Sequence, residues 1–169
     1  MRTALMLLVL LPVSCSTLTV ESDLSGTAFL QPMLEFQSSR QPAEKVGRIV
    51  QGKPLEISKR FYSVGGSPIV AVLSDDGRVA YRRVPAGSKV HLAESEFRKA
   101  TKADTQALSG TVGVGFSEEM VFMAWGIPGS KKTEQTILGT THFLYYGRMF
   151  HGGLQVQTIN GKVSLVSNW

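Results

Sequence analysis

The sequence predicts an α+β protein, in which a small β-rich module precedes a domain with a short helix packed on a three-stranded antiparallel sheet. Three observations predict this class. A β-rich run over residues 67–84 is interrupted by a turn signal. Residues 117–128 carry helix start and stop signals. Asn160-Gly161 separates two strand-like runs, which is a strong signal for a tight hairpin.

The chain begins with the layout of an export signal. Arg2 is followed by an apolar run over residues 4–13 and then by a small residue, Ser14. The apolar run is about half the roughly 20 residues that a helix needs to span a bilayer. We therefore interpret residues 1–14 as a signal peptide and not as a transmembrane helix.

Residues 11–15, Leu-Pro-Val-Ser-Cys, resemble the lipobox of bacterial lipoproteins, with the leucine one place early. The resemblance implies a covalent lipid on Cys15, the only cysteine in the chain, and no other cofactor. Ser16 after the cysteine implies, by the same resemblance, a protein anchored in the outer membrane and facing the periplasm. The alternative is a plain signal peptide that is cut nearby.

We expect residues 15–44 to be the lipid anchor and a tether. Ser, Thr, Gln and Pro dominate this stretch, which is typical of extended linkers. One apolar cluster, residues 29–36, interrupts it, and we expect that cluster to pack on its own domain. A docking segment for a partner is the alternative reading of this cluster.

Residues 45–109 are predicted to form a basic β-rich module that ends in a connecting helix. Strands are expected at residues 67–73, 78–84 and 88–92, with Asp76-Gly77 in the first turn. Weaker strand candidates cover residues 45–50 and 55–63. Residues 93–108 are expected to be a surface helix, with Glu94 and Arg98 paired at i and i+4.

The net charge of +5 is unevenly distributed. Residues 40–102 hold 13 basic residues and 6 acidic ones, so the basic surplus belongs to the β-rich module. Such a surplus suits an acidic partner, acidic glycans such as peptidoglycan, or anionic lipid headgroups. A basic surface that is simply solvated is the alternative. Nucleic acid is not an expected partner of an exported protein.

Residues 110–169 are predicted to form the second domain. Ser117 is a natural N-cap, and Gly126 followed by Pro128 ends the helix. Its apolar face contains Met120, Val121, Ala124 and Trp125. Three strands are expected to follow, at residues 141–146, 154–159 and 163–167, the last two joined by the Asn160-Gly161 turn.

This segment resembles the BamE/SmpA/OmlA family of small outer-membrane lipoproteins. The matching pieces are residues 115–121, Trp125-Gly126-Ile127-Pro128, Tyr145-Tyr146-Gly147-Arg148 and residues 159–163. The resemblance covers about 60 residues and implies a BamE-like helix-on-sheet fold. It also implies an accessory role in an envelope assembly machine. The region before this segment departs from the family pattern.

The sequence shows no pattern typical of an active site. His91, His142 and His151 are dispersed, and neither a metal-ligand spacing nor a nucleophile motif is present. We therefore expect no catalytic residues and no metal, and a structural role for His142. The glycines of residues 110–115 lack the ending of a phosphate-binding loop.

The remaining candidates are binding residues. Aromatic residues and arginine carry much of the energy of protein interfaces. The predicted partner-binding residues are Tyr145, Tyr146, Arg148, Phe150, Arg82 and Arg83. We expect a non-enzymatic, lipid-anchored subunit that binds another protein or complex of the cell envelope. The alternative is a periplasmic inhibitor, or a module that binds peptidoglycan or another anionic ligand.

Overall fold

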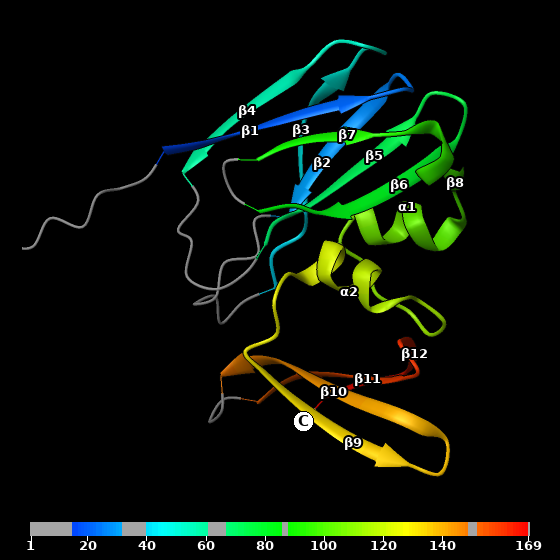
Figure 1. The fold of residues 1–169 in the computed structure, drawn as a ribbon. Helices are drawn as coiled ribbons and strands as arrows, with labels where there is room; N and C mark the ends of the chain where they lie inside the picture. The colour runs from blue at the N-terminus through cyan, green and yellow to red at the C-terminus, as the bar shows by residue number, and fades with distance from the viewer. Residues whose placement is uncertain (1–14, 32–39, 61–66, 86–87, 149–151, 169) are drawn as a thin grey trace, which may run out of the picture.

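The computed structural model describes residues 15–31, 40–60, 67–85, 88–148 and 152–168, so the expected signal peptide lies outside the described residues. Within these ranges the chain forms 12 strands in three sheets and only two α-helices. The predicted α+β class with a BamE-like helix on three strands is therefore wrong, because the protein is mostly β. Figure 1 shows two stacked sheets, then the helices, then a third sheet.

The first two sheets form a sandwich. Their strands are β1 (Cys15–Ser22), β2 (Gly26–Gln31), β3 (Glu44–Ile49), β4 (Leu55–Arg60), β5 (Ile69–Ser74), β6 (Arg78–Arg83), β7 (Lys89–Leu92) and β8 (Arg98–Lys99). Sheet A has the order β4-β1-β7 and sheet B the order β3-β2-β5-β6-β8. Neighbouring strands are antiparallel except β1 and β7, which are parallel.

Two strands, β1 and β2, occupy the first part of the tether predicted over residues 15–44. β1 is the central strand of sheet A, and β2 pairs with both β3 and β5 in sheet B. Leu18 and Val20 of β1 alternate with threonine residues, and both are fully buried. Ala28 and Leu30 of β2 are at most 1% exposed. Serine and threonine content suggests a linker, but threonine also favours strands. The alternation of apolar and polar residues is the pattern typical of a half-buried strand, and the tether prediction did not take it into account.

β5 connects the two hydrophobic cores of the molecule. Val70 and Val72 pack in the core between sheets A and B, whereas Ile69 and Ala71 pack in the core that contains the helices. A strand covered on both faces needs a continuous apolar run, and Ile69-Val70-Ala71-Val72 provides one. The sandwich and the C-terminal part therefore share a core strand.

The predicted helix over residues 93–108 is wrong in its first half. Residues Glu94–Glu96 form a single 3-10 turn, β8 follows, and only α1 (Lys102–Leu108) is α-helical. Thr101 and Asp104 form a capping box that starts the helix there. Phe97, which is 8% exposed, packs into the sandwich core and holds its neighbours in extended conformation.

The expected Glu94–Arg98 pair does not form. Glu94 instead contacts Arg78 at 2.9 Å, and Arg98 contacts Asp104 at 2.7 Å.

The second helix, α2 (Glu118–Trp125), has the expected ends. The Ser117 hydroxyl accepts a hydrogen bond from the backbone N–H of Met120 at 3.3 Å, and Gly126 has a φ of 79°. Every residue from Met120 to Trp125 is buried, and not only the predicted apolar face, because α2 lies between two sheets. Among the described residues, no helix is long and apolar enough to cross a membrane.

Sheet C covers the other side of the helices. Its strands are β9 (Ser130–Thr136), β10 (Gly139–Arg148), β11 (Gly152–Ile159) and β12 (Lys162–Asn168), in the order β12-β11-β10-β9. The last three match the predicted strands, and positive φ angles at Asn160 (50°) and Gly161 (77°) confirm the type I′ turn. β9 was not predicted from the sequence because its residues are polar and largely exposed, as suits an edge strand.

Candidate functional site

The two adjacent tyrosines predicted to bind a partner lie on opposite faces of sheet C. Tyr146 belongs to the core, where it is 5% exposed and its ring meets Trp125 edge-on with centroids 5.3 Å apart. Its hydroxyl donates to the Gly126 carbonyl oxygen at 3.1 Å. Burial raises the pKa of the Tyr146 phenol far above its ordinary value. Tyr146 is therefore a packing residue and not a contact residue.

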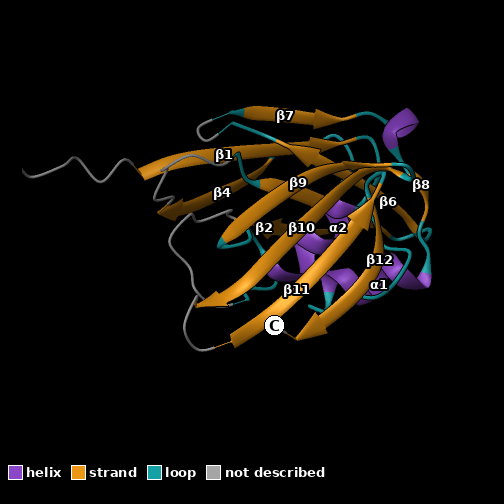
Figure 2. Ribbon diagram, turned by 90° about the horizontal axis from the view of Figure 1, so that it is seen from below, coloured by secondary structure: helices purple, strands orange, loops and turns teal. Residues whose placement is uncertain are grey.

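Tyr145 points to the opposite side, which we call the outer face of sheet C. Antiparallel pairing places two rows of side chains there: Lys132, Phe143, Gln157 and Leu165 in one, and Ser130, Tyr145, Gln155 and Ser167 in the other. Figure 2 looks onto this sheet, and no other element lies in front of its four strands. The face combines two central aromatic rings with polar residues around them.

Solvent reaches this surface. Leu165 is 47% exposed, and Phe143 and Tyr145 are partly exposed. Phe143 and Leu165 were not among the predicted binding residues, although the period of two along β10 places Phe143 beside Tyr145. The contribution of Leu165 depends on the pairing of β12 with β11, which local sequence patterns do not specify.

The other predicted binding residues do not join this face. Arg82 forms an ion pair with Glu96 and donates to the carbonyl oxygen of His91, so it faces the sheet A side. Arg83 points the other way and lies over the Phe122 ring of α2 at 4.9 Å. Arg148 is described only as the last residue of β10, and Phe150 lies outside the described residues.

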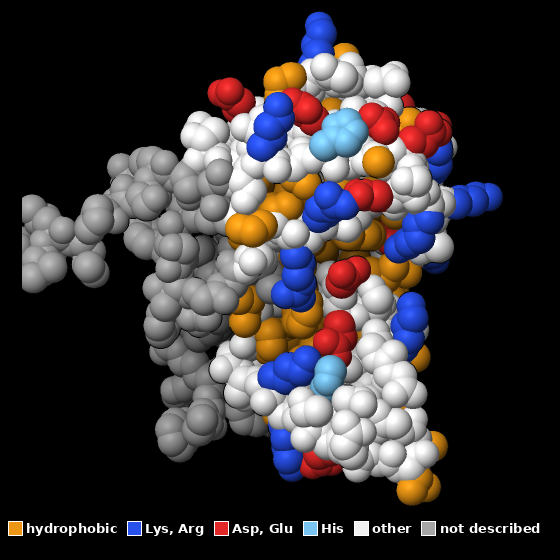
Figure 3. All heavy atoms as spheres, viewed as in Figure 1, with side chains coloured by type: hydrophobic (Ala, Val, Ile, Leu, Met, Phe, Trp, Pro, Cys, Tyr) orange, Lys and Arg blue, Asp and Glu red, His pale blue; other side chains and the backbone are white. Residues whose placement is uncertain are grey.

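Arg82 and Arg83 do not form one basic patch, because their side chains point to opposite sides of sheet B. Figure 3 shows basic and acidic side chains interspersed over the visible face of the molecule. This distribution does not favour acidic glycans as ligands of that face.

One cluster of titratable residues links α2 to sheet C. Glu118 accepts hydrogen bonds from the Thr158 hydroxyl at 2.7 Å and from Nδ1 of His142, and the Lys131 ammonium lies 3.4 Å away. Burial raises the pKa of Glu118, but these partners outweigh it and hold the pKa below its ordinary value. An ionised carboxylate with this many donors attaches the start of α2 to β9, β10 and β11, which agrees with the structural role expected for His142.

A second cluster surrounds Asp104, whose side chain is fully buried. Its carboxylate accepts from the Arg98 guanidinium at 2.7 and 2.9 Å, from the Tyr81 hydroxyl at 2.9 Å, and from the N–H and hydroxyl of Thr101 at 2.7 and 2.6 Å. Burial favours the protonated acid, but the hydrogen bonds from Arg98 and Thr101 outweigh it and hold the pKa of Asp104 well below its ordinary value. Burial, followed by the charge of Asp104, raises the pKa of Tyr81.

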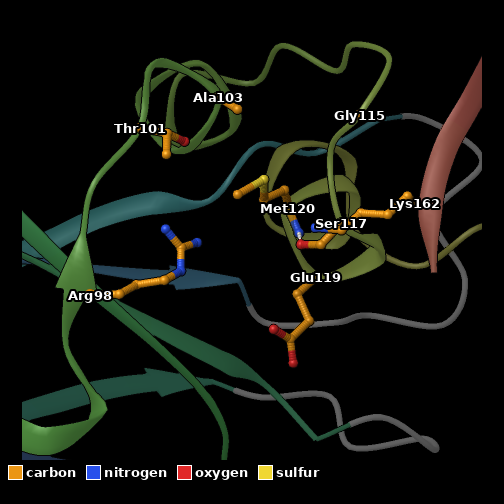
Figure 4. Close-up of a pocket in the computed structure, with 8 residues that line it drawn as sticks. All are labelled: Arg98, Thr101, Ala103, Gly115, Ser117, Glu119, Met120 and Lys162. Carbon is orange, nitrogen blue, oxygen red and sulfur yellow. Dashed lines mark hydrogen bonds between the residues drawn. The ribbon is translucent and has the colours of Figure 1, made fainter. Parts of the chain in front are cut away.

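A shallow pocket of about 390 Å³ opens beside this second cluster. Its lining comes from β8, α1, the start of α2 and β12: Arg98, Thr101, Ala103, Gly115, Ser117, Glu119, Met120 and Lys162. Figure 4 shows Arg98 and Glu119 reaching into the same space from opposite sides. Opposite charges share the lining, and Arg98 is already held by Asp104, so the pocket matches neither a strongly anionic nor a strongly cationic ligand.

The described residues contain no group of three or more His, Cys, Asp or Glu side chains placed to hold a metal ion. No family model matches the chain, and no match is found among curated proteins or among solved structures. Of the sites described above, the outer face of sheet C has the composition and the accessibility of a contact surface.

Proposed function

We propose that this protein is a lipid-anchored, non-catalytic binding protein of the periplasmic face of the outer membrane. It holds another protein of the cell envelope through the outer face of sheet C. The observation that carries the proposal is the uncovered sheet with Phe143 and Tyr145 at its centre and polar side chains around them. Aromatic anchors within a polar rim are typical of protein interfaces.

The position of Cys15 in the fold would determine how close the folded domain lies to the membrane. Cys15 is the first residue of β1 and pairs with Arg60, the last residue of β4. With a lipid on Cys15, the folded domain begins immediately at the anchor and sits close to the bilayer. Figure 1 places sheet C on the far side of the helices from sheet A, so the anchor and the outer face of sheet C serve different contacts.

Replacing Cys15 with alanine should release the protein from membranes. The lipid would be the only covalent link to the bilayer, and a single soluble domain would otherwise fractionate with the periplasm. The measurement is immunoblotting of membrane and periplasmic fractions, together with mass spectrometry of the mature N-terminus. Ser16→Ala is the matched control and should leave the protein attached. Membrane pelleting of the Cys15→Ala variant after a high-salt wash would contradict the anchor.

The partner should be captured from sheet C and not from sheet A. A photo-crosslinking amino acid placed at Leu165 in intact cells should yield one dominant protein adduct. The same amino acid at Glu56, an exposed position on β4, should not yield that adduct. Mass spectrometry of the product identifies the partner.

Tyr145→Ala, introduced together with the Leu165 crosslinker, should reduce the adduct about tenfold, the size of a modest interface hot spot. Tyr145→Phe retains the ring and should reduce it much less. Equal adducts at Leu165 and Glu56, or no effect of Tyr145→Ala, would contradict a specific interface on this face. Unchanged melting curves of the variants serve as the folding control.

A further inference from the structure

We infer that the end of the molecule that carries Cys15 is a docking surface for anionic lipid headgroups, which lays the domain directly on the bilayer. This inference rests on the proposed lipid anchor at Cys15. We call this end of the molecule the basic end, because five basic residues lie at or next to its strand termini: Arg40, Lys59, Arg60, Arg83 and Arg148.

The strand register brings these residues to the end where Cys15 lies. Cys15 pairs with Arg60, and Ser16 pairs with Lys59, so two basic positions of β4 are the register partners of the first two positions of β1. β6 ends at Arg83 and β10 ends at Arg148. In Figure 1 both of these strands run toward the side from which β1 starts, and Figure 2 shows the same for β10.

Arg40 belongs to the same end because of its connection to β2. The Gln31 side chain, at the end of β2, donates to the backbone carbonyl oxygen of Gln41 at 2.6 Å, which holds Arg40 beside that strand end. The Arg40 guanidinium lies over the Trp125 ring, 5.2 Å from its centroid. Arg40 and Arg83 both stack on aromatic rings of α2, and within the described residues neither forms an ion pair with a carboxylate.

Acidic residues are concentrated at the other end of the sandwich. The turns and strand starts there contain Asp23, Glu56, Asp75, Asp76 and Glu94. At the basic end, the described strand termini include one carboxylate, Glu44, beside Leu30. Arg78 at the acidic end contacts both Asp76 and Glu94, whereas no carboxylate of the described ranges pairs with Arg40 or Arg83.

This arrangement fits a membrane better than other occupants. A lipid on Cys15 holds this end at the headgroup layer, and each Lys or Arg near an anionic surface strengthens binding about fivefold. A second copy of the chain would bring like charges together at this end. Four of the 13 basic residues within residues 40–102 belong to this end, and one described carboxylate, Glu44, lies at a strand terminus there.

The test uses the full-length chain with Cys15→Ser, so that no lipid contributes to binding. Its co-sedimentation is measured with phosphatidylcholine vesicles that contain increasing fractions of phosphatidylglycerol. Binding should increase with the anionic fraction and decrease as the salt concentration rises to about 0.15 M, where the Debye length is about 8 Å. Lys59→Gln/Arg60→Gln should weaken binding about 20-fold, from two contacts of about fivefold each.

The matched control is Lys53→Gln/Lys102→Gln, which removes the same charge from exposed positions away from the basic end. It should weaken binding less than about threefold, the nonspecific effect of net charge. Equal losses in the two double variants, or binding that does not depend on phosphatidylglycerol, would overturn the inference. So would an acidic protein captured by a crosslinker at Arg60 in place of lipid. Circular dichroism melting checks that both variants fold.

The two proposals can fail separately. If wild-type protein carries no lipid but the Cys15→Ser chain binds anionic vesicles through Lys59 and Arg60, the anchor is wrong and the basic end stands. If Cys15 is lipidated and the vesicles do not bind the Cys15→Ser chain, the anchor stands and the inference about the basic end is wrong.

Discussion

Replacing Trp125 with alanine should lower the free energy of unfolding by about 3–5 kcal/mol, the range for a buried tryptophan replaced by alanine. Trp125 is 6% exposed and packs edge-on against Tyr146. Its indole N–H donates to the carbonyl oxygen of Gly110 at 3.0 Å, so the substitution also leaves that carbonyl without its partner. The Arg40 guanidinium would lose the ring that it covers.

Urea unfolding followed by circular dichroism measures this effect. Trp125→Phe is the control, since it keeps an aromatic ring beside Tyr146 and should cost much less. Because α2 shares a core with β5 of sheet B and with sheet C, the variant should still unfold in one transition. An unchanged midpoint would contradict the packing of Trp125, and two separate transitions would contradict a core shared by the sandwich and sheet C.

Replacing Asp104 with alanine should destabilise the protein by about 3 kcal/mol. The carboxylate half of the capping box, which accepts from the N–H and hydroxyl of Thr101, is worth about 1 kcal/mol. Leaving the Tyr81 hydroxyl without its acceptor costs about 1–3 kcal/mol more. Arg98 is 49% exposed and can be hydrated, so its unpaired charge adds little. Asp75→Ala, which breaks an exposed ion pair with Arg48, should have a much smaller effect in the same urea experiment.

The contribution of Asp104 to the free energy of unfolding should decrease as the pH falls. Its folded-state pKa lies below its unfolded-state pKa of about 3.9. The stabilisation is therefore complete above that value, declines as the pH falls below it, and disappears once the pH is below the folded-state pKa. Wild-type protein should approach the stability of Asp104→Asn on acidification from pH about 6 to about 3. A constant difference across this range would contradict an ionised Asp104.

Several elements were predictable because their signals are local. Ser117, Gly126 and the apolar residues between them define α2 within ten positions, and the structure confirms the helix. Asn160-Gly161 encodes positive φ angles directly, and the hairpin of β11 and β12 follows from them. Short-range rules succeed here because the interacting groups are neighbours in the chain.

The errors arose where distant parts of the chain decide the outcome. Residues 15–31 have linker-like composition, and their burial depends on β4, β5 and β7, which lie 24 or more positions away. Phe97 breaks the expected helix because the sandwich core accepts its ring. β9 is polar and exposed, and it is a strand only because β10 offers it backbone hydrogen bonds.

The residues of the candidate sites also fall into those that local sequence predicts and those that only tertiary structure places. The sequence by itself determined the basic surplus of residues 40–102, the caps of α2 and the tight hairpin turn, since composition and short-range geometry encode them, and it predicts an export-type N-terminus with Cys15. Tertiary structure alone decided that Tyr145 faces outward while Tyr146 is buried, that Arg82 and Arg83 point apart, and that Arg60 lies opposite Cys15. The reason is that each depends on which strands pair, in which register, and on which sheet face the core forms.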